Sequence, residues 1–380
     1  MKFDYVIVGG GSAGSVMANR LSADPLVSVC LLEAGGGGKD FVIRAPAMVA
    51  SMISGRPPIN NWALKTLPQP ELNNRCGFQP RGKALGGSSA INAMLYVRGH
   101  QRDYDEWAEL GCEGWGWADV LPYFLKSEGN TMGAFDLHGS DGPLQVADQS
   151  EPRAITNAFF QAAEGLQIRR NNDFNGPRQE GVGPYQVTQF HSGPHKGERC
   201  SAAAAYLFPA MKRSNLTVVT KARVRRILMD DGHATGVEYD KGGVQVVLAK
   251  REVISCSGTF GSPHLLMLSG IGAADELQSH GIEVLHHVEG VGQNLQDHLD
   301  YTVSYHSKRP DVVGLNPAAL MRLIMAGLQW RRDGTGLFAT PFAEGAGFLR
   351  TDPGLDRPDV QLHFVCAIVD DHLRKIHFKD

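Results

Sequence analysis

Three features are scarce in this chain of 380 residues, and each absence excludes a class of protein. The six cysteines are scattered without a CxxC pair or a His/Cys cluster, which argues against a disulfide framework and a zinc site. No apolar run approaches the length of a membrane span. Charge of one sign is not in excess, because the formal net charge is −3, so the sequence gives no reason to expect nucleic-acid binding. We expect no metal site.

The first residues also lack a secretory leader, because an apolar, β-branched strand is predicted at once over Phe3–Val8. We therefore expect a cytoplasmic protein with reduced thiols. The sequence leaves open a peripheral contact with the inner membrane through a surface patch, and it does not define an oligomeric state. The length suffices for two domains.

Glycine, by contrast, is abundant, and its most informative cluster is Gly9–Gly14. This G-x-G-x-x-G turn directly follows the strand Phe3–Val8 and precedes a segment with helical spacing of apolar residues. A second apolar strand, Val27–Leu32, ends at Glu33. The order strand, glycine turn, helix, strand and acid predicts a dinucleotide-binding unit.

Each residue of this unit has a physical reason. Gly9 allows a tight turn, Gly11 lets the backbone approach a pyrophosphate, and Gly14 lets the helix pack closely on the strand. The N-terminus of the helix offers unpaired N–H groups and the positive end of a dipole to the phosphates. Glu33 can accept hydrogen bonds from ribose hydroxyls. The motif alone does not separate NAD from FAD.

A second glycine-rich segment spans Pro80–Gly99 and contains Gly86-Gly87-Ser88-Ser89. Such a core can lie close to a flat ligand and supply N–H and hydroxyl donors. Elsewhere the periodicity predicts helices over Tyr104–Leu110, Trp117–Ser127, Pro152–Glu164 (starting near Ser150), Ser201–Met211, Pro263–Ser269 and Leu320–Trp330, a β-meander over Leu216–Ser255 and a strand over Val360–Ile368. Residues 40–75 carry five prolines and are predicted to be an irregular, lid-like excursion.

The segment Pro80–Gly99 resembles the glucose-methanol-choline (GMC) family of FAD-dependent oxidoreductases. The likeness continues at Gly258–Gly272 and Val291–His298. Asn61-Trp62 and Pro68-Gln69-Pro70 are similar to the choline dehydrogenase and bacterial alcohol dehydrogenase branch. The resemblance runs from residue 3 to residue 380.

The resemblance implies an α/β fold: an FAD-binding Rossmann-like (GMC-type) domain with a β-meander and a partial α+β substrate domain. We place the FAD-binding region at 1–300, with a helical insert at about 100–200 that belongs partly to the substrate domain, and the truncated substrate domain at 301–380. The residues assigned to FAD by resemblance are Gly9, Gly11, Ser12, Ala13 and Gly14 at the pyrophosphate, Glu33 at the adenosine ribose, Val224 at the adenine, Ala84, Gly86, Asn92, Ala93, Met94 and Leu95 beside the isoalloxazine, and Ala34 and Gly258 near the dinucleotide. Val224 can equally be a buried strand valine, and the two interpretations are compatible.

Some relatives carry a histidine that is covalently bound to the flavin, and the matching position here is Ile91. We therefore expect non-covalent FAD. The family's catalytic histidine and its His or Asn partner lie C-terminal to Asp380, so no catalytic residue is assigned and the chain is expected to be the N-terminal two-thirds of such an enzyme. We assign no base role to His138, His298 or His363, and we interpret Asp370-Asp371-His372 as a solvated loop.

The function implied is an FAD-dependent oxidoreductase that acts on the CH–OH group of a primary alcohol, choline-like or aliphatic. Hydride would pass to flavin N5, and the electrons to a quinone or another acceptor. Two alternatives stay open: a catalytically inactive FAD-binding fragment and a GMC-family hydroxynitrile lyase, against which the missing secretory leader argues. An NAD-dependent dehydrogenase is disfavoured, because Gly82–Asn92 has no role in a simple nicotinamide site.

Overall fold

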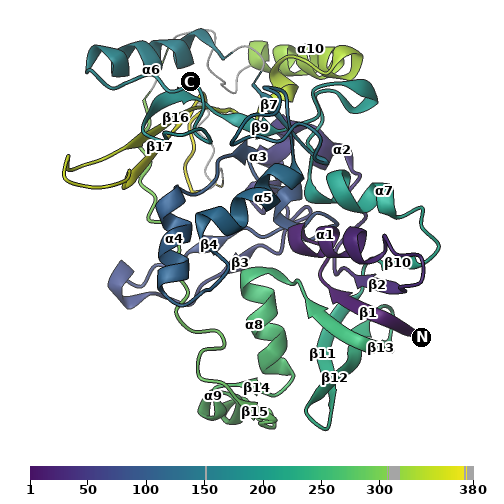
Figure 1. Ribbon diagram of the computed structural model, residues 1–380. Helices are drawn as coiled ribbons and strands as arrows, with labels where there is room; N and C mark the ends of the chain where they lie inside the picture. The colour runs from purple at the N-terminus through teal and green to yellow at the C-terminus, as the bar shows by residue number, and fades with distance from the viewer. Residues whose placement is uncertain (150–151, 306, 308–316, 372–373, 375–380) are drawn as a thin grey trace. The chain divides into compact units, whose positions relative to one another are not determined.

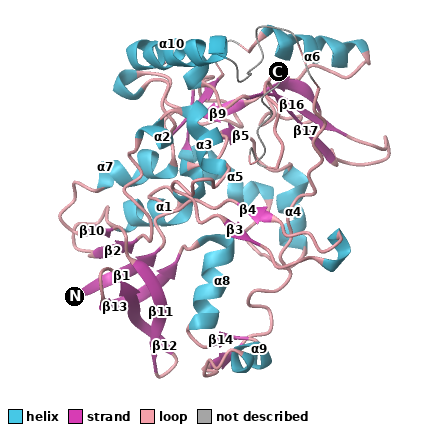
Figure 2. Ribbon diagram, turned by 180° about the vertical axis from the view of Figure 1, so that it is seen from behind, coloured by secondary structure: helices cyan, strands magenta, loops and turns pink. Residues whose placement is uncertain are grey.

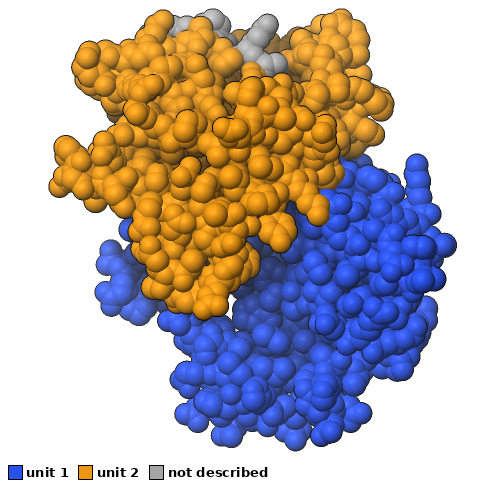
Figure 3. All heavy atoms as spheres, in the orientation of Figure 1, with its two compact units in different colours: residues 1–40, 58–91, 201–301 blue, residues 41–57, 92–200, 302–380 orange. Residues whose placement is uncertain are grey.

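The computed structural model describes residues 1–149, 152–305, 307, 317–371 and 374, without the side chains of 317–320. By its internal contacts the chain forms two units, coloured separately in Figure 3: unit 1 comprises Met1–Asp40, Pro58–Ile91 and Ser201–Tyr301, and unit 2 comprises Phe41–Pro57, Asn92–Cys200 and Thr302–Asp380. The domain boundaries predicted from the sequence, 1–300 and 301–380, stay a prediction.

Unit 1 is built on a six-stranded sheet, which Figure 1 shows around the N-terminus. In spatial order its strands are β10 (Leu216–Val219), β2 (Val29–Leu32), β1 (Lys2–Val8), β13 (Val244–Ser255), β12 (His233–Asp240) and β11 (Arg223–Asp230). The four strands from β10 to β13 are parallel, and β12 and β11 continue the sheet in antiparallel pairing. The predicted α/β class is confirmed.

Apolar side chains cover both faces of this sheet, because successive residues of a strand point to opposite sides. Val6 and Val8 of β1 lie in one buried cluster, which Leu265 of helix α8 (Gly258–Leu268) joins. Ile7, between them, lies in the other cluster together with Ala18 of helix α1 (Ser12–Leu21). The two helices are thereby fixed against opposite faces.

The structure corrects the predicted meander over Leu216–Ser255 in two places. β10 joins no hairpin but pairs in parallel with β2, because Lys221 and Ala222 cross over the end of β2 and donate their N–H groups to Gly35 O and Glu33 O, each at 2.9 Å. Residues 244–255 form one strand, β13, rather than two. Its pairing with β1 shifts around Asp4, which lies 3.7 Å from both Lys250 Nζ and Arg251 Nε. The charged pair Lys250-Arg251 interrupts the apolar pattern of the sequence, and for this reason two strands were predicted.

The remaining elements of unit 1 are short. They are β3 (Leu64–Lys65), 3₁₀ turns at Pro70–Leu72 and Gly87–Ala90, β4 (Phe78–Gln79), a π-helical turn at Ala203–Leu207 followed by α7 (Phe208–Ala210), β14 (Ile271–Gly272), α9 (Ala274–Ser279) and β15 (His286–His287). The helix predicted over Ser201–Met211 is present over residues 202–210. It contains a π-helical turn next to Pro209, which lacks the N–H that a regular α-helix requires there.

Unit 2 contains two smaller sheets, of order β5-β9-β7-β6 and β17-β16-β8 (Figure 2). Their strands are β5 (Leu95–Tyr96), β6 (Glu128–Asn130), β7 (Leu144–Asp148), β8 (Gly181–Pro184), β9 (Gln186–Thr188), β16 (Ala343–Leu349) and β17 (Val360–Val365). Its helices are α2 (Phe41–Arg44), α3 (Val49–Ile53), α4 (Gln101–Glu109), α5 (Trp117–Ser127), α6 (Ala154–Gly165) and α10 (Pro317–Asp333), with 3₁₀ turns at Pro46–Met48, Gly193–His195 and Leu337–Ala339.

The predicted irregular excursion over residues 40–75 is corrected in its first part. Phe41–Ile53 forms short helical segments that bury Ile43 and Met52, at 2% and 0% exposure. Pro46 begins a 3₁₀ turn, where its missing N–H would have had no partner. A lid role for this region stays a prediction. The predicted helix start near Ser150 lies outside the described residues, and no helix within the described part of the chain has the length and apolarity that crossing a membrane requires.

The parallel part of the sheet should be sensitive to lost volume at Leu31, whose side chain is 0% exposed. We expect Leu31→Ala to lower the free energy of unfolding by about 3 kcal/mol, because it leaves a cavity between the sheet and α1. Leu26→Ala is the matched control, since Leu26 is 87% exposed. Urea denaturation of both variants measures the difference, and equal losses would contradict this packing.

Candidate functional site

The turn after β1 requires glycine at two positions for the protein's own packing. Gly9 has φ of +100°, and a Cβ there would lie 2.5 Å from Cys256 O. A Cβ on Gly14 would lie 1.9 Å from Gly9 O, so α1 could not keep its place against the end of β1. These two positions fit the predicted roles of tight turn and close helix packing.

Gly11 differs from its two neighbours in the motif. Its φ is −72°, and a Cβ there would meet Gly87 Cα at 3.8 Å and Cys256 O at 4.0 Å, which are ordinary contacts. The fold of the chain therefore tolerates a side chain at this position. A ligand that lies against the backbone would not tolerate it, and this is the predicted role of Gly11.

The second glycine-rich segment packs directly on the first, although the two are far apart in the sequence. Gly86 N donates to Gly10 O at 2.8 Å, and a Cβ on Gly87 would lie 2.7 Å from Gly11 Cα. Gly82 is equally constrained, because its Cβ would lie 2.0 Å from Gly87 O. The structure thus brings together two motifs that the sequence analysis assigned to one ligand.

Two helix N-termini lie at the same edge of the sheet. β1 and β13 are parallel, with Val8 opposite Ser255, so the turns into α1 and α8 are adjacent. The N-cap residues of the two helices, Gly11 and Ser257, form no side-chain cap, and Ser12 and Ala13 are exposed in the first turn of α1. Gly258 has φ of +77° and open space where a Cβ would be. Uncapped N–H groups and the positive ends of two helix dipoles make this edge suited to an anion such as a pyrophosphate.

Glu33 supplies the buried carboxylate of the site, with 6% exposure. Its Oε2 accepts a hydrogen bond from Gly10 N at 2.8 Å, and its Oε1 accepts one from Gly35 N at 2.7 Å. Burial raises the pKa of Glu33, while the two N–H donors and nearby Lys83 oppose the rise. Each carboxylate oxygen retains a further lone pair for a hydroxyl donor.

Three further residues at this edge were not given roles by the sequence analysis. Lys83 Nζ lies 4.4 Å from the centre of the Trp62 ring, and the guanidinium carbon of Arg223 lies 5.8 Å from the same ring. The sequence analysis named Trp62 only as part of Asn61-Trp62, which is similar to the choline dehydrogenase and alcohol dehydrogenase branch of the family. Val224, next to Arg223, lies on the edge strand β11 and is partly buried against the sheet core, and its place at the adenine stays a prediction. Ala34 follows Glu33 directly, and Ala84 is fully buried, bridging to Gly36.

The predicted isoalloxazine segment continues into unit 2 as Asn92, Ala93, Met94 and Leu95. There Arg199 Nη1 donates to Asn92 O at 2.6 Å and to Asn92 Oδ1 at 2.9 Å. Met94 is 0% exposed with φ of +61°, and its carbonyl accepts from Thr188 N at 2.8 Å. Burial lowers the pKa of Arg199 to about 9. The segment is therefore firmly held within unit 2, and its place relative to the glycine turns stays a prediction.

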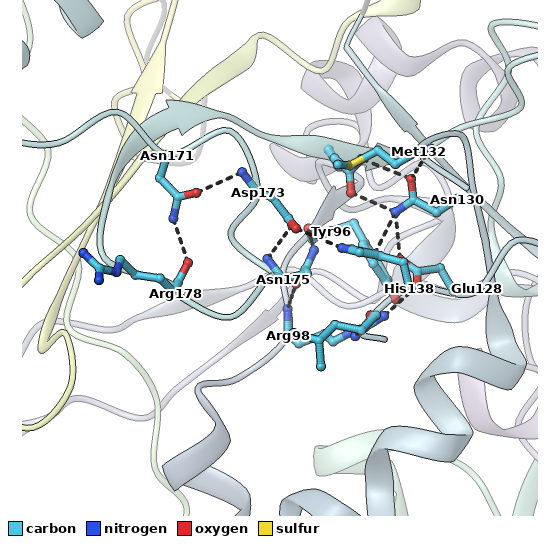
Figure 4. A network of polar contacts seen from close by, with 12 residues as sticks. Tyr96, Arg98, Glu128, Asn130, Met132, His138, Asn171, Asp173, Asn175 and Arg178 are labelled. Carbon is cyan, nitrogen blue, oxygen red and sulfur yellow. Dashed lines mark hydrogen bonds and ion pairs between the residues drawn. The ribbon is translucent and has the colours of Figure 1, made fainter. Parts of the chain in front are cut away.

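A buried polar network anchors the strand that follows this segment (Figure 4). Asn175 Nδ2 donates to Tyr96 O at 3.1 Å, and Asn175 N donates to Asp173 Oδ1 at 3.0 Å. His138 lies between two carboxylates, with Nε2 3.0 Å from Asp173 Oδ2 and Nδ1 3.1 Å from Glu128 Oε1. Arg98 connects the two ends of the network. Its Nη2 donates to Glu128 Oε2 at 2.7 Å, and its backbone N donates to Asn175 Oδ1 at 2.7 Å.

The charges of the network balance only when the imidazole is protonated. Hydrogen bonds to Asp173 and Glu128 raise the pKa of His138 to about 9. Burial raises the pKa of Glu128, but hydrogen bonds from His138 and Asn130 outweigh it and lower the pKa overall. His138 thus has a structural role, which no local pattern in the sequence reveals. Elsewhere too, no three His, Cys, Asp or Glu side chains within the described ranges are placed to hold a metal ion.

Comparison with known proteins decides the family. Residues 3–300 match the sequence profile of the family described as GMC oxidoreductase. The chain belongs to the GMC oxidoreductase family.

Relatives within the GMC family include alcohol dehydrogenase (acceptor) of Pseudomonas putida, 43% identical over 98% of this chain and 67% of the relative. Mitochondrial choline dehydrogenase of Homo sapiens is 43% identical over 98% of this chain and 63% of the relative. The crystal structure of pyridoxine 4-oxidase from Mesorbium loti superposes with a TM-score of 0.81 at 31% identity, over 96% of this chain and 66% of that one. The chain spans about two thirds of the length of these curated relatives. The resemblance predicted from the sequence is confirmed.

We expect the His138 network to make the stability of this GMC protein depend on pH. Because the pKa of His138 rises from 6.5 to about 9 in the folded state, its contribution is complete below pH 6.5 and is lost as the pH rises through about 9. We expect the free energy of unfolding to fall over this range by on the order of 2 kcal/mol more in the unchanged protein than in His138→Gln.

Urea denaturation at a series of pH values measures this difference. His233→Gln, at an exposed histidine, is the control and should follow the unchanged protein. Identical pH profiles for His138→Gln and the unchanged protein would show that the imidazole is not held in its charged form.

Proposed function

We propose that the chain binds FAD non-covalently and forms part of an oxidoreductase that acts on the CH–OH group of a primary alcohol, choline-like or aliphatic. The observation that carries the proposal is the meeting of two glycine-rich backbone segments, Gly9–Gly14 and Gly82–Gly87, beside the buried carboxylate of Glu33. The names of the relatives, alcohol dehydrogenase and choline dehydrogenase, support the substrate class. The resemblance assigns the position of the covalently linked histidine to Ile91, which is buried and has no nucleophilic atom, and this supports non-covalent binding.

The residues present fit the cofactor. The open backbone at Gly11 and the first turn of α1, with Ser12 and Ala13 exposed, would hold the pyrophosphate. Glu33 would accept from the ribose hydroxyls while its two backbone donors keep the carboxylate in place. The N-terminus of α8 at Gly258 would offer the positive end of a second helix dipole to the phosphates.

Bound FAD would supply the acceptor for the hydride that leaves the carbinol carbon. The chain's own part is to bind and orient. Arg199 holds Asn92 and Asn175 of the His138 network holds Tyr96, so hydrogen bonds within the chain itself would restrict the segment Asn92–Leu95. Rigidity of this kind lowers the entropy lost on reaching a reactive geometry. The electrons would pass to a quinone or another acceptor, and no residue from 1 to 380 is assigned as proton acceptor.

Alanine substitutions should separate the ligand-facing glycine from the packing glycine. Gly11→Ala should keep the melting temperature of the protein without cofactor but weaken FAD binding at least about tenfold, because only the pyrophosphate conflicts with the new methyl group. Gly14→Ala should lower the melting temperature itself, since its Cβ would lie 1.9 Å from Gly9 O. Flavin fluorescence titration and thermal melts measure the two effects.

Gly165→Ala is the matched control, because a Cβ there meets nothing within 4 Å. It should bind FAD as the unchanged protein does, and acid precipitation should leave the flavin in the supernatant. Full FAD affinity in Gly11→Ala, or flavin retained in the precipitate, would contradict the proposed mode of binding.

The reaction class is tested with the full-length protein under anaerobic conditions. Choline or a primary aliphatic alcohol should bleach the flavin absorbance, because the hydride has no acceptor other than the cofactor. Cleavage of a cyanohydrin without bleaching would instead favour the hydroxynitrile lyase alternative. Stoichiometric flavin with neither reaction would favour an inactive FAD-binding protein.

A further inference from the structure

The turn at Asn92 and Ala93 in unit 2 has its acceptors occupied and its donors free. Asn92 Oδ1 accepts hydrogen bonds from Met94 N at 3.1 Å and from Arg199 Nη1 at 2.9 Å, and Asn92 O accepts from the same Nη1 at 2.6 Å. Among the described residues, by contrast, no acceptor pairs with Asn92 N, Asn92 Nδ2 or Ala93 N. Asn92 is exposed and Ala93 is half-buried. We call these three nitrogens the donor set.

Arg199 binds this turn from the interior of unit 2, where Arg199 is 2% exposed. Its Nε donates to Ile43 O at 2.9 Å, and its backbone N donates to Arg44 O at 2.9 Å. Both carbonyls lie at the C-terminal end of α2, where a helix has no N–H groups of its own to pair with them. Because the guanidinium is planar, the bond from Nε to α2 fixes the direction in which Nη1 reaches Asn92.

Helix α2 is itself anchored in unit 2. Phe41, at its start, meets Trp330 edge-on at 5.6 Å between ring centroids. Arg44 Nη1, at its end, lies 2.9 Å from Glu198 Oε1. Arg199 therefore connects an anchored helix to an exposed turn, and the orientation of the donor set follows from a contact that lies beneath it.

We propose that Arg199 is a positioning residue that directs the donor set toward the flavin ring. This role rests on the proposed function, because the resemblance places Asn92–Leu95 beside the isoalloxazine. A hydride carries two electrons and one proton, so the net charge of the ring falls by one when it accepts a hydride. Donors that are already oriented stabilise this charge without a cost of reorganisation, and they should bind the reduced cofactor more tightly than the oxidised one.

The test measures the flavin midpoint potential of the full-length protein by anaerobic titration against reference dyes. Arg199→Lys keeps the positive charge, but one ammonium group lacks the planar fork that holds Ile43 O and Asn92 O together. The ratio of reduced to oxidised affinity should fall about tenfold, which for two electrons is a potential about 30 mV lower. The melting temperature of the cofactor-free variant, measured in parallel, shows whether it folds.

Arg213→Lys is the matched control. Arg213 lies in unit 1, and its Nη1 donates to Asn19 O and to Ser22 Oγ. The substitution changes a comparable pair of contacts away from the turn, so the potential should stay that of the unchanged protein.

Two substitutions in the turn itself complete the test. Asn92→Asp should fold even where Arg199→Lys does not, because the side chain is exposed, and it should lower the potential by replacing the Nδ2 donor with a carboxylate oxygen. Asn92→Ala combined with Arg199→Lys should lower the potential by less than the sum of the two separate shifts, because both changes disturb the same contact.

The outcomes distinguish this role from the proposed function. Absence of FAD from the unchanged protein would contradict both. With FAD bound, the role of Arg199 alone is contradicted by an unchanged potential in folded Arg199→Lys or in Asn92→Asp, by an equal shift in Arg213→Lys, or by full additivity of Asn92→Ala and Arg199→Lys.

Discussion

The site in unit 1 depends on one steric constraint, which is that three backbone segments meet where no side chain fits between them. Gly14 packs on Gly9 O, Gly9 packs on Cys256 O, and Gly87 packs on Gly11 Cα. This contact sets the position of α1 against β1 and carries the loop at Gly82–Gly87 to the same edge. Glu33 then bridges Gly10 and Gly35 with its two oxygens. The surface at this edge of the sheet is therefore formed by backbone atoms rather than by side chains.

The parts of this arrangement that follow from local chemistry could be predicted from the sequence. Strand β1, the glycine turn, α1 and the acid at the end of β2 form one continuous stretch, and each signal in it concerns near neighbours. Helix α5 was predicted over Trp117–Ser127 and occurs over the same residues. The pairing of β10 with β2 could not be predicted in this way. It depends on hydrogen bonds from Lys221 and Ala222 to residues almost two hundred positions earlier in the chain.

The polar network of unit 2 is a second feature that could not be predicted from local sequence patterns. No sequence motif contains all four charged residues of the network, which are Arg98, Glu128, His138 and Asp173. Taken singly, each is of a residue type that usually lies at the protein surface. In the structure Arg98, Glu128 and His138 are buried, at 2%, 0% and 3% side-chain exposure, and Asp173 is partly buried at 24%. A buried ion pair needs compensation on both sides, so the four groups are interdependent. The sequence analysis assigned no catalytic role to His138, which stays a prediction, and it had no means of detecting the contacts of His138 with Glu128 and Asp173.

Helix α10 shows that two predictions must be made separately: whether a segment forms a helix, and which face of that helix is buried. The apolar spacing over Leu320–Trp330 predicted a helix, and the helix is present. Yet its apolar residues fall on two faces, and only packing distinguishes them: Trp330 and Ala326 meet unit 2, while Met325 and Leu328 meet solvent. The spacing of apolar residues therefore predicts that a helix forms, whereas the face that becomes buried depends on which other elements pack against it.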